Sequence, residues 1–291
     1  MKVLLGCLSA NGFGGSELYH YELAKELRLL GNDVTLFTLI PIDRYDHKRL
    51  ALAAIGVKQT DTSRLDASET YDIIIVSQPQ TTQLLLESYP NTPIVSIIHS
   101  EIRCEDPVLN SRINHYIAIR QPIVDLLVNS YRIPADKVSL IYNPIDTTKF
   151  RPAEEQRYDK TTGIFVGEVL DPIRFQAVSH LVQSCIENNW NLLIMSDSKY
   201  DFNHPNITYV DKRWDTETLV RYVNFTGGIL LGRTTLEGLC CGVPGYVYEI
   251  DTQGSILNID LIAPGKLEHL CDSKLVAQQH IELYDRVLKD F

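Results

Sequence analysis

Residues 1–31 read MKVLLGCLSANGFGGSELYHYELAKELRLLG. The run from Lys2 to Leu8 is almost continuously apolar, which predicts a strand buried on both faces of a sheet. A glycine-rich loop, NGFGGS, follows this strand. We then expect a helix that begins at an N-cap, Ser16, and stops at Gly31, with one apolar stripe turned to the core. A buried strand, a glycine-rich loop and an amphipathic helix in this order predict the first unit of a parallel α/β sheet.

The same alternation continues along the chain. Strands are predicted at 33–39, 56–60, 71–77, 93–99, 115–119, 137–143, 161–167, 191–196, 206–210, 227–232 and 244–250. Helices are predicted at 81–89, 121–131, 172–188, 215–223 and 276–291. A charged, proline-containing stretch at 146–160 interrupts the pattern and is typical of an interdomain linker.

The predicted fold class is therefore α/β, with two Rossmann-like domains facing each other across a cleft. The N-terminal domain is expected at 1–145 and the C-terminal domain at 161–291, with the last helix packing back toward the N-terminal domain. Ligands of open α/β sheets bind beyond the carboxyl ends of the strands, so the cleft is the expected site.

The composition narrows the class of protein. With 291 residues, 44% hydrophobic and 22% charged, the chain is typical of a globular protein. Its net charge of −10 disfavours broad binding to nucleic acid or anionic membranes. We expect neither a signal peptide nor a transmembrane segment, since no apolar run has the required length and flanks. The six cysteines show no metal-ligand or disulfide spacing, so we expect a reduced, cytoplasmic setting.

The first loop is the first candidate ligand site. Gly14 and Gly15 lie between a strand and a helix, where bare backbone can approach a phosphate or a sugar hydroxyl closely. A tight turn that needs glycine would explain the loop without a ligand. Glu17 occupies the position where a dinucleotide fingerprint has its third glycine, and no acidic residue ends the second strand. An NAD-dependent oxidoreductase is therefore disfavoured.

Two polar residues follow predicted strands of the first domain. His99 could hydrogen-bond a substrate hydroxyl or line a charged site, and a structural histidine is the alternative. Gln78 directly follows the strand predicted at 71–77. Together with Ser16, it is a candidate for contacts on the acceptor side. A surface loop explains Gln78 equally well.

The second domain carries a lone acid and two arginines in positions suited to an anion. Glu237 stands in LGRTTLEGLCCGVPG, residues 231–245, among small and apolar residues. Arg233 begins a short predicted helix beside Thr234 and Thr235, an arrangement that suits a phosphate at a helix N-terminus. Arg174 near the start of another helix could pair with a diphosphate, or could be a solvated surface residue.

Three segments together resemble one family. They are GFGGSELYHYELAKELRLLGNDVTLFT at 12–38, KVSLIYNPIDTTKFRP at 137–152 and TTLEGLCCGVP at 234–244. The second is similar to an Asn-Gly-Val-Asp hinge with Phe-x-Pro, and the third to a Glu-Ala-x-Ala-x-Gly-x-Pro segment. In this order they resemble the GT-B glycosyltransferases, and glycosyltransferase family 4 most of all, over nearly the whole chain.

The resemblance implies transfer of a sugar, a hexose or a pentose, from a nucleotide-diphosphate donor, without a metal and usually with retention of the anomeric configuration. Gly14 and Gly15 would lie over the donor phosphates, His99 would contact the donor sugar and Glu237 would hold the ribose. Amides near the diphosphate would come from Thr234, Thr235 and Leu236. The donor would be a co-substrate, and no cofactor is expected.

Two positions depart from the family pattern. The family places a glutamate eight residues before Glu237, and this chain has Ile229. Glu168 stands where the family has an arginine for the diphosphate, which leaves Arg174 nearby. We therefore expect His99 and Arg174 to serve catalysis, and Arg233 to supply the missing positive charge.

Other functions remain open at this stage. An inactive sugar-nucleotide-binding protein is suggested by Ile229 and Glu168, and a sugar-nucleotide epimerase could use the same scaffold. We expect no metal site, because no D-x-D triplet of the metal-dependent sugar transferases occurs. The acceptor could be a glycan, a lipid-linked sugar, a small molecule, a protein or a nucleic acid, and the sequence leaves the oligomeric state open.

Overall fold

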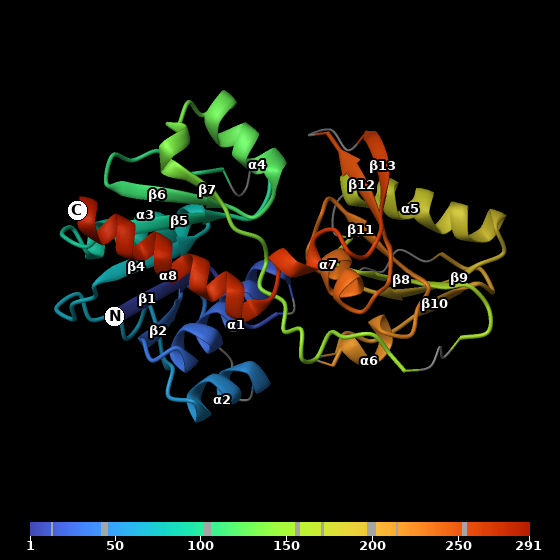
Figure 1. Ribbon diagram of the computed structural model, residues 1–291, viewed down its shortest axis with the longest axis horizontal. Helices are drawn as coiled ribbons and strands as arrows, with labels where there is room; N and C mark the ends of the chain where they lie inside the picture. Colours follow the sequence, from blue (N-terminus) through green and yellow to red (C-terminus); the bar gives the residue numbers. More distant parts are fainter. Residues whose placement is uncertain are drawn as a thin grey trace. The chain divides into compact units, whose positions relative to one another are not determined.

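The computed structural model describes residues 1–12, 14–41, 46–101, 106–154, 158–169, 172–196, 202–213, 215–251 and 255–291. The chain forms two compact units (Figure 1). The first unit holds residues 1–12, 16–144 and 273–291, and the second holds 145–272 together with Gly14 and Gly15. This division differs from the predicted boundaries, because the described part of the linker belongs to the second unit and the last helix belongs to the first.

The first unit is built on a seven-stranded sheet in the order β3-β2-β1-β4-β5-β6-β7. Its strands are β1 Lys2–Cys7, β2 Asp33–Thr38, β3 Lys58–Asp61, β4 Ile73–Ser77, β5 Ile94–Ile98, β6 Ile113–Ala118 and β7 Val138–Leu140. Every pairing in this sheet is parallel. All residues of β4 and β5 are buried, which confirms that the apolar runs IIIVS and IVSII are central parallel strands.

The first unit has seven helical segments among its described residues. They are α1 Gly15–Leu29, α2 His47–Ala54, α3 Pro79–Ser88, α4 Gln121–Asp125, the π-helical η2 Leu126–Ser130, the 3-10 helix η3 Ala135–Lys137 and α8 Ser273–Asp290. α1 begins one residue before Ser16, so the predicted N-cap is already inside the helix. Its end is as predicted: Gly31 has φ +87°, and the Asn32 amide donates to the Leu27 carbonyl at 3.1 Å. This left-handed glycine closes the helix in a Schellman motif.

The last helix, α8, belongs to the first unit and is the red ribbon in Figure 1. It contacts α1 through polar groups that are buried. Tyr19 Oη is 2.7 Å from His280 Nε2, and Ser273 Oγ donates to Glu26 Oε1 at 3.1 Å. The predicted packing of the C-terminal helix against the N-terminal domain is therefore confirmed, although the helix starts three residues earlier than expected.

The second unit is built on a six-stranded sheet in the order β10-β9-β8-β11-β12-β13. Its strands are β8 Thr162–Val166, β9 Asn191–Met195, β10 Ile207–Tyr209, β11 Phe225–Ile229, β12 Gly245–Ile250 and β13 Ile256–Ile262. Its helices are α5 Pro172–Glu187, α6 Glu217–Val220, α7 Arg233–Cys240 and the 3-10 helix η4 Glu268–Leu270. The edge strand β13 is antiparallel to β12 and was not predicted.

Each sheet reverses its strand order at one point. In the first unit this point lies between β1 and β4, and in the second between β8 and β11. The carboxyl ends of strands at such a switch point leave a crevice in which α/β proteins bind ligands. The glycine-rich loop follows β1, Gln78 follows β4, and α7 follows β11. Among the described helices, none combines the length and apolarity that crossing a bilayer requires.

Candidate functional site

The amino end of α7 packs directly on the backbone of β11 and β12. A Cβ atom at Gly228 would lie 2.6 Å from Thr235 Oγ1, and one at Gly245 would lie 2.5 Å from Thr235 Cγ2. Both positions need glycine because any larger residue would push the helix away from the sheet. These two glycines therefore let the first turn of α7 pack closely on β11, which borders the switch point of the second sheet, and on β12.

Arg233 and Glu237 form a buried ion pair on α7. Arg233 Nε donates to Glu237 Oε1 at 2.7 Å, and the side chains are 6% and 5% exposed. The spacing of four residues places both groups on one face of the helix. The two residues predicted to contact phosphate and ribose, Arg233 and Glu237, are therefore bonded to each other in this structure.

The two threonines of this turn differ in their surroundings. Thr234 Oγ1 donates to the Val166 carbonyl at 3.0 Å, which ties α7 to the carboxyl end of β8. The Thr235 hydroxyl is buried without a hydrogen-bond partner among the described residues. Leu236 is fully buried, so its side chain belongs to the core. The predicted amide of Leu236 is not available to a ligand, because it donates to the Gly232 carbonyl at 3.4 Å. The backbone N–H groups that precede it are the ones that a helix start leaves unpaired within the helix and that this turn can offer a ligand.

Beside α7, the end of β8 carries an ion pair that the sequence did not suggest. Lys212 Nζ lies 3.2 Å from Glu168 Oε1. Glu168, where the resemblance predicted an arginine, is exposed and is accompanied by this lysine from beyond β10. Arg174 is the third residue of α5 and is partly buried. Its catalytic role stays a prediction.

The glycine-rich loop is held at Gly12 from two sides. The Gly12 amide donates to Glu17 Oε1 at 3.1 Å, and Lys48 Nζ donates to the Gly12 carbonyl. Burial lowers the pKa of Lys48, and nearby Asp46 and Glu17 oppose this shift. At Gly15 an added Cβ would meet no described atom within 4 Å, and its φ is not positive. The conformation of Gly15 therefore does not require glycine, and the approach of Gly14 and Gly15 to a ligand stays a prediction.

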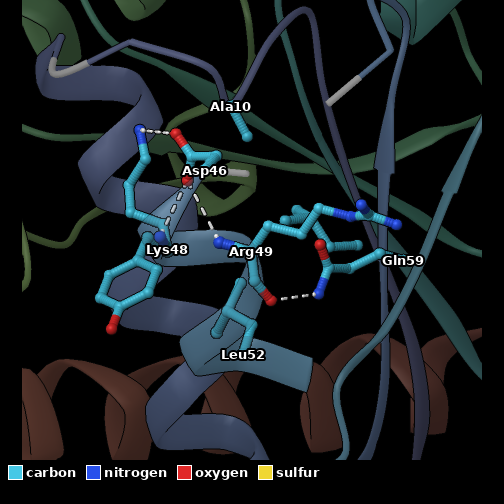
Figure 2. Close-up of a pocket in the computed structure, with 8 residues that line it drawn as sticks. Ala10, Asp46, Lys48, Arg49, Leu52 and Gln59 are labelled. Atoms are coloured by element: carbon cyan, nitrogen blue, oxygen red, sulfur yellow. Dashed lines mark hydrogen bonds and ion pairs between the residues drawn. The ribbon is translucent and has the colours of Figure 1, made fainter. Parts of the chain in front are cut away.

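A small pocket in the first unit is lined in part by Lys48 (Figure 2). It is lined by Ala10, Tyr21, Leu36, Asp46, Lys48, Arg49, Leu52 and Gln59. Asp46 caps α2 by accepting from the amides of Lys48 and Arg49, and Gln59 Nε2 donates to the Arg49 carbonyl. None of the predicted site residues lines this pocket.

At the carboxyl ends of β4 and β5, His99 contacts Ser77, which also contacts His20 of α1. Ser77 Oγ is 3.0 Å from His99 Nε2 and 3.0 Å from His20 Nε2. His20 Nδ1 is 2.7 Å from the Ser16 carbonyl, at the start of α1. Tyr19 packs edge-on against His99, with the ring centroids 5.1 Å apart. The structure thus links His99 and Ser16, two predicted site residues, through His20 and Ser77, which sequence reasoning missed.

Gln78 occupies a strained position at the switch point. Its φ is +63° and it precedes Pro79, the first residue of α3. Its side-chain oxygen accepts from the Leu8 amide at 3.1 Å, so it bridges the ends of β4 and β1. Leu230, which follows β11 in the second unit, has a similar φ of +61°. Non-glycine residues in this region are costly and often mark functional sites, and the acceptor-side role of Gln78 stays a prediction.

Two further charged residues lie at strand ends of the first unit. Arg120, which follows β6, is 2% exposed and forms an ion pair with Glu101, which follows β5. The sequence analysis did not select them. For Arg120 the signal was similar to the one used for His99, because it directly follows the apolar strand predicted at 115–119.

A third histidine of this region, His280, lies on α8. His280 bonds Tyr19 through Nε2 and Tyr284 through Nδ1, the latter at 2.6 Å. Burial lowers the pKa of His20 to about 4 and that of His280 to about 3. Both side chains are fully buried. The folded protein therefore holds them as neutral imidazoles at neutral pH.

Lowering the pH from about 7.5 to about 5 is expected to reduce the free energy of unfolding by about 2 kcal/mol for each of these histidines. In this window the unfolded chain protonates them and the folded protein does not, so stability falls as the pH falls. Urea denaturation at both pH values measures the loss. His280→Gln keeps hydrogen-bonding groups but does not titrate, so its pH dependence should be smaller. An unchanged dependence in that variant would contradict the assignment.

The cysteines and acidic groups show no sign of metal chemistry in the part of the chain that the structure describes. Cys7, Cys185, Cys240, Cys241 and Cys271 are free and buried. Burial raises the pKa of Cys240 and Cys241 to about 12 each, so these thiols stay protonated and unreactive. No group of three or more His, Cys, Asp or Glu side chains arranged for a metal ion occurs among the described residues.

Comparison with known proteins agrees with the fold of the two units. Residues 13–149 match the model of Glycosyltransferase Family 4. A glycosyltransferase from Rickettsia africae has a TM-score of 0.70 and 12% identity, covering 100% of this chain and 99% of that chain. Anabaena Alr3699/HepE in complex with UDP-glucose has a TM-score of 0.65 and 13% identity, with 100% and 99% covered.

A third similar structure belongs to a candidate UDP-N-acetylglucosamine 2-epimerase from Listeria monocytogenes. Its TM-score is 0.55 and its identity 11%, with 99% of this chain and 90% of that chain covered. No curated protein sequence matches the chain significantly. At these identities the likeness shows the fold, and the predicted pair of Rossmann-like α/β domains of GT-B type is confirmed.

Proposed function

Because residues 13–149 match the model of Glycosyltransferase Family 4 and the fold is of GT-B type, we propose that the protein transfers a hexose or pentose from a nucleotide-diphosphate sugar to an acceptor. The observation that carries the proposal is the buried Arg233–Glu237 pair on the first turns of α7. It lies at the switch point of the second sheet, where α/β proteins bind nucleotides. UDP-glucose bound to HepE, which has this fold, supports a nucleotide-sugar donor.

In this proposal the first turn of α7 receives the nucleotide. Glu237 accepts from ribose hydroxyls through carboxylate lone pairs that Arg233 leaves available, because a carboxylate has about four acceptor sites. The backbone N–H groups of Thr234 and Thr235 face the diphosphate, together with the positive end of the helix. Arg233 orients Glu237 and adds positive charge close to the phosphates.

The chemical step needs stabilisation of the departing diphosphate. Helix N–H groups and the guanidinium groups of Arg174 and Arg233 can provide it in a preorganised form, so the proposal needs no metal ion. Gly14 and Gly15 approach the donor closely, in keeping with the open space around Gly15. His99 contacts the sugar, and Ser16 and Gln78 lie on the acceptor side. Retention of configuration and a cytoplasmic location are part of the same proposal.

A nucleotide screen followed by product analysis tests the proposal. We expect one of UDP, GDP, ADP and CMP to raise the melting temperature, because a ligand that binds the folded state stabilises it by mass action. The matching sugar nucleotide should then be consumed with EDTA present, and consumption should increase when an acceptor is added. Stabilisation by none of the four nucleotides would contradict a nucleotide-sugar donor.

The same experiment separates the alternatives. Conversion of the donor to its epimer without an acceptor would show an epimerase, which the fold shared with the Listeria protein makes a specific second candidate. Nucleotide binding without turnover would show an inactive binder, as Ile229 and Glu168 suggested. Loss of turnover on chelation by EDTA would overturn the metal-independent mechanism.

A further inference from the structure

The direction of the hydrogen bonds between Ser16 and His99 follows from the atoms involved. A carbonyl oxygen only accepts, so His20 Nδ1, 2.7 Å from the Ser16 carbonyl, carries a hydrogen. His20 is fully buried and neutral at neutral pH, since burial lowers its pKa to about 4. A neutral imidazole carries one N–H, so His20 Nε2 is an acceptor. The hydroxyl of Ser77, 3.0 Å away, must donate to it.

The direction of the Ser77–His20 hydrogen bond determines the direction of the Ser77–His99 hydrogen bond. Ser77 has a single hydrogen, and His20 takes it, so Ser77 Oγ faces His99 as an acceptor. His99 Nε2, at 3.0 Å from Ser77 Oγ, therefore carries the hydrogen. Burial, and next to it the neighbouring His20, hold the pKa of His99 well below its ordinary value. His99 is neutral, and its Nδ1 is a lone-pair acceptor.

That acceptor has no partner among the described residues, and the atom is buried. A buried polar atom without a hydrogen bond costs free energy that a donor from a ligand would recover. Phosphate and carboxylate oxygens only accept, so they cannot satisfy Nδ1. A hydroxyl group can.

We propose that Ser77 and His20 are positioning residues that hold His99 in the Nε2–H tautomer, so that His99 Nδ1 accepts a hydrogen bond from a sugar hydroxyl. The proposal deepens the proposed function, on which it rests for the identity of the ligand. It assigns His99 to a hydroxyl of the sugar and excludes the diphosphate as its partner.

Nitrogen-15 NMR of the histidine-labelled free protein tests the tautomer without any assay of turnover. The His99 signals, assigned by their loss in His99→Gln, should show Nε2 protonated and Nδ1 unprotonated at neutral pH. In His20→Leu the Ser77 hydrogen becomes available to His99 Nε2, so the tautomer should shift toward Nδ1–H. In Ser77→Ala the preference for Nε2–H should weaken, and Ser77→Thr should restore it.

His115→Gln is the matched control. His115 Nε2 is bonded to Ser139 at 2.9 Å, in a His–Ser pair outside this network, and its loss should leave the His99 signals unchanged. An Nδ1–H tautomer in the wild type would overturn the proposal. So would an unchanged His99 tautomer in a folded His20→Leu variant. Should the variants fail to fold, the wild-type spectrum alone decides between the two tautomers.

Binding of deoxy donors tests the ligand. With UDP-glucose as the probe, removal of one sugar hydroxyl should weaken binding about 3- to 10-fold in the wild type, the range of one neutral hydrogen bond. The same removal should change binding less than 2-fold or so in Ser77→Ala. An equal loss in both proteins would overturn the role of Ser77. If UDP-glucose does not bind at all, the proposed donor fails while the NMR result on the tautomer still stands.

Discussion

Replacing Glu237 by leucine is expected to lower the free energy of unfolding by about 3–5 kcal/mol. The Arg233 side chain is 6% exposed, and its Nε donates to Glu237 Oε1 at 2.7 Å. The variant removes this carboxylate and leaves a buried guanidinium without it, at a large desolvation cost. Urea denaturation of the wild type and the variant measures the difference.

A double variant separates stability from function. Arg233→Met combined with Glu237→Leu removes both charges, and apolar residues of similar volume often replace a buried ion pair at little cost. Its stability should return close to that of the wild type. Its affinity for the nucleotide that stabilises the wild type should still be about 100-fold lower, since ribose and phosphate lose their charged partners. Calorimetric titration of both proteins with that nucleotide checks this.

Glu168→Leu is the matched control for this experiment. Glu168 also forms an ion pair in the second unit, with Lys212, but its side chain is 44% exposed. Exposed pairs contribute about 0–1 kcal/mol, so this variant should lose little stability. Wild-type nucleotide affinity in the double variant would show that the Arg233–Glu237 pair is only structural.

The sequence predicted most of the fold because central parallel strands are continuous apolar runs. β4 and β5 are buried on both faces and could hardly be missed. β13 was missed because it lies at an edge and buries little, with Leu257 and Leu261 exposed. α2 was missed because it is short and buries little beyond Lys48 and Leu52. Sequence patterns therefore fail to predict the elements that bury the fewest side chains in the core.

The candidate site was predictable only in part. Arg233 and Glu237 are four residues apart on a helix, so their pairing could have been predicted from spacing alone. The sequence instead assigned each to a different part of the ligand. His20, Ser77 and His99 are far apart in the chain and meet only because parallel strands end at one edge of the sheet. That meeting is a tertiary property, which spacing does not reveal.

Replacing Tyr284 by alanine is expected to cost about 3–5 kcal/mol of unfolding free energy. Tyr284 is fully buried on α8, and its hydroxyl lies 2.6 Å from His280 Nδ1. His280 in turn binds Tyr19 on α1 at 2.7 Å. Tyr284→Phe keeps the ring and removes only the hydroxyl, so about 1–3 kcal/mol should be lost. Glu282→Ala, at an exposed position of the same helix, should change stability by less than about 0.5 kcal/mol.

Hydrogen exchange shows where this loss is felt. α1 starts at Gly15 in the glycine-rich loop and carries both Tyr19 and His20. If α8 supports α1 through His280, Tyr284→Ala should speed amide exchange along α1, while the strands β4 and β5 stay protected. Faster exchange confined to α8 would instead mean that the last helix packs on the first unit without stabilising α1. Faster exchange in α1 would mean that the far end of the chain helps to hold the loop and the His20–Ser77–His99 network in place.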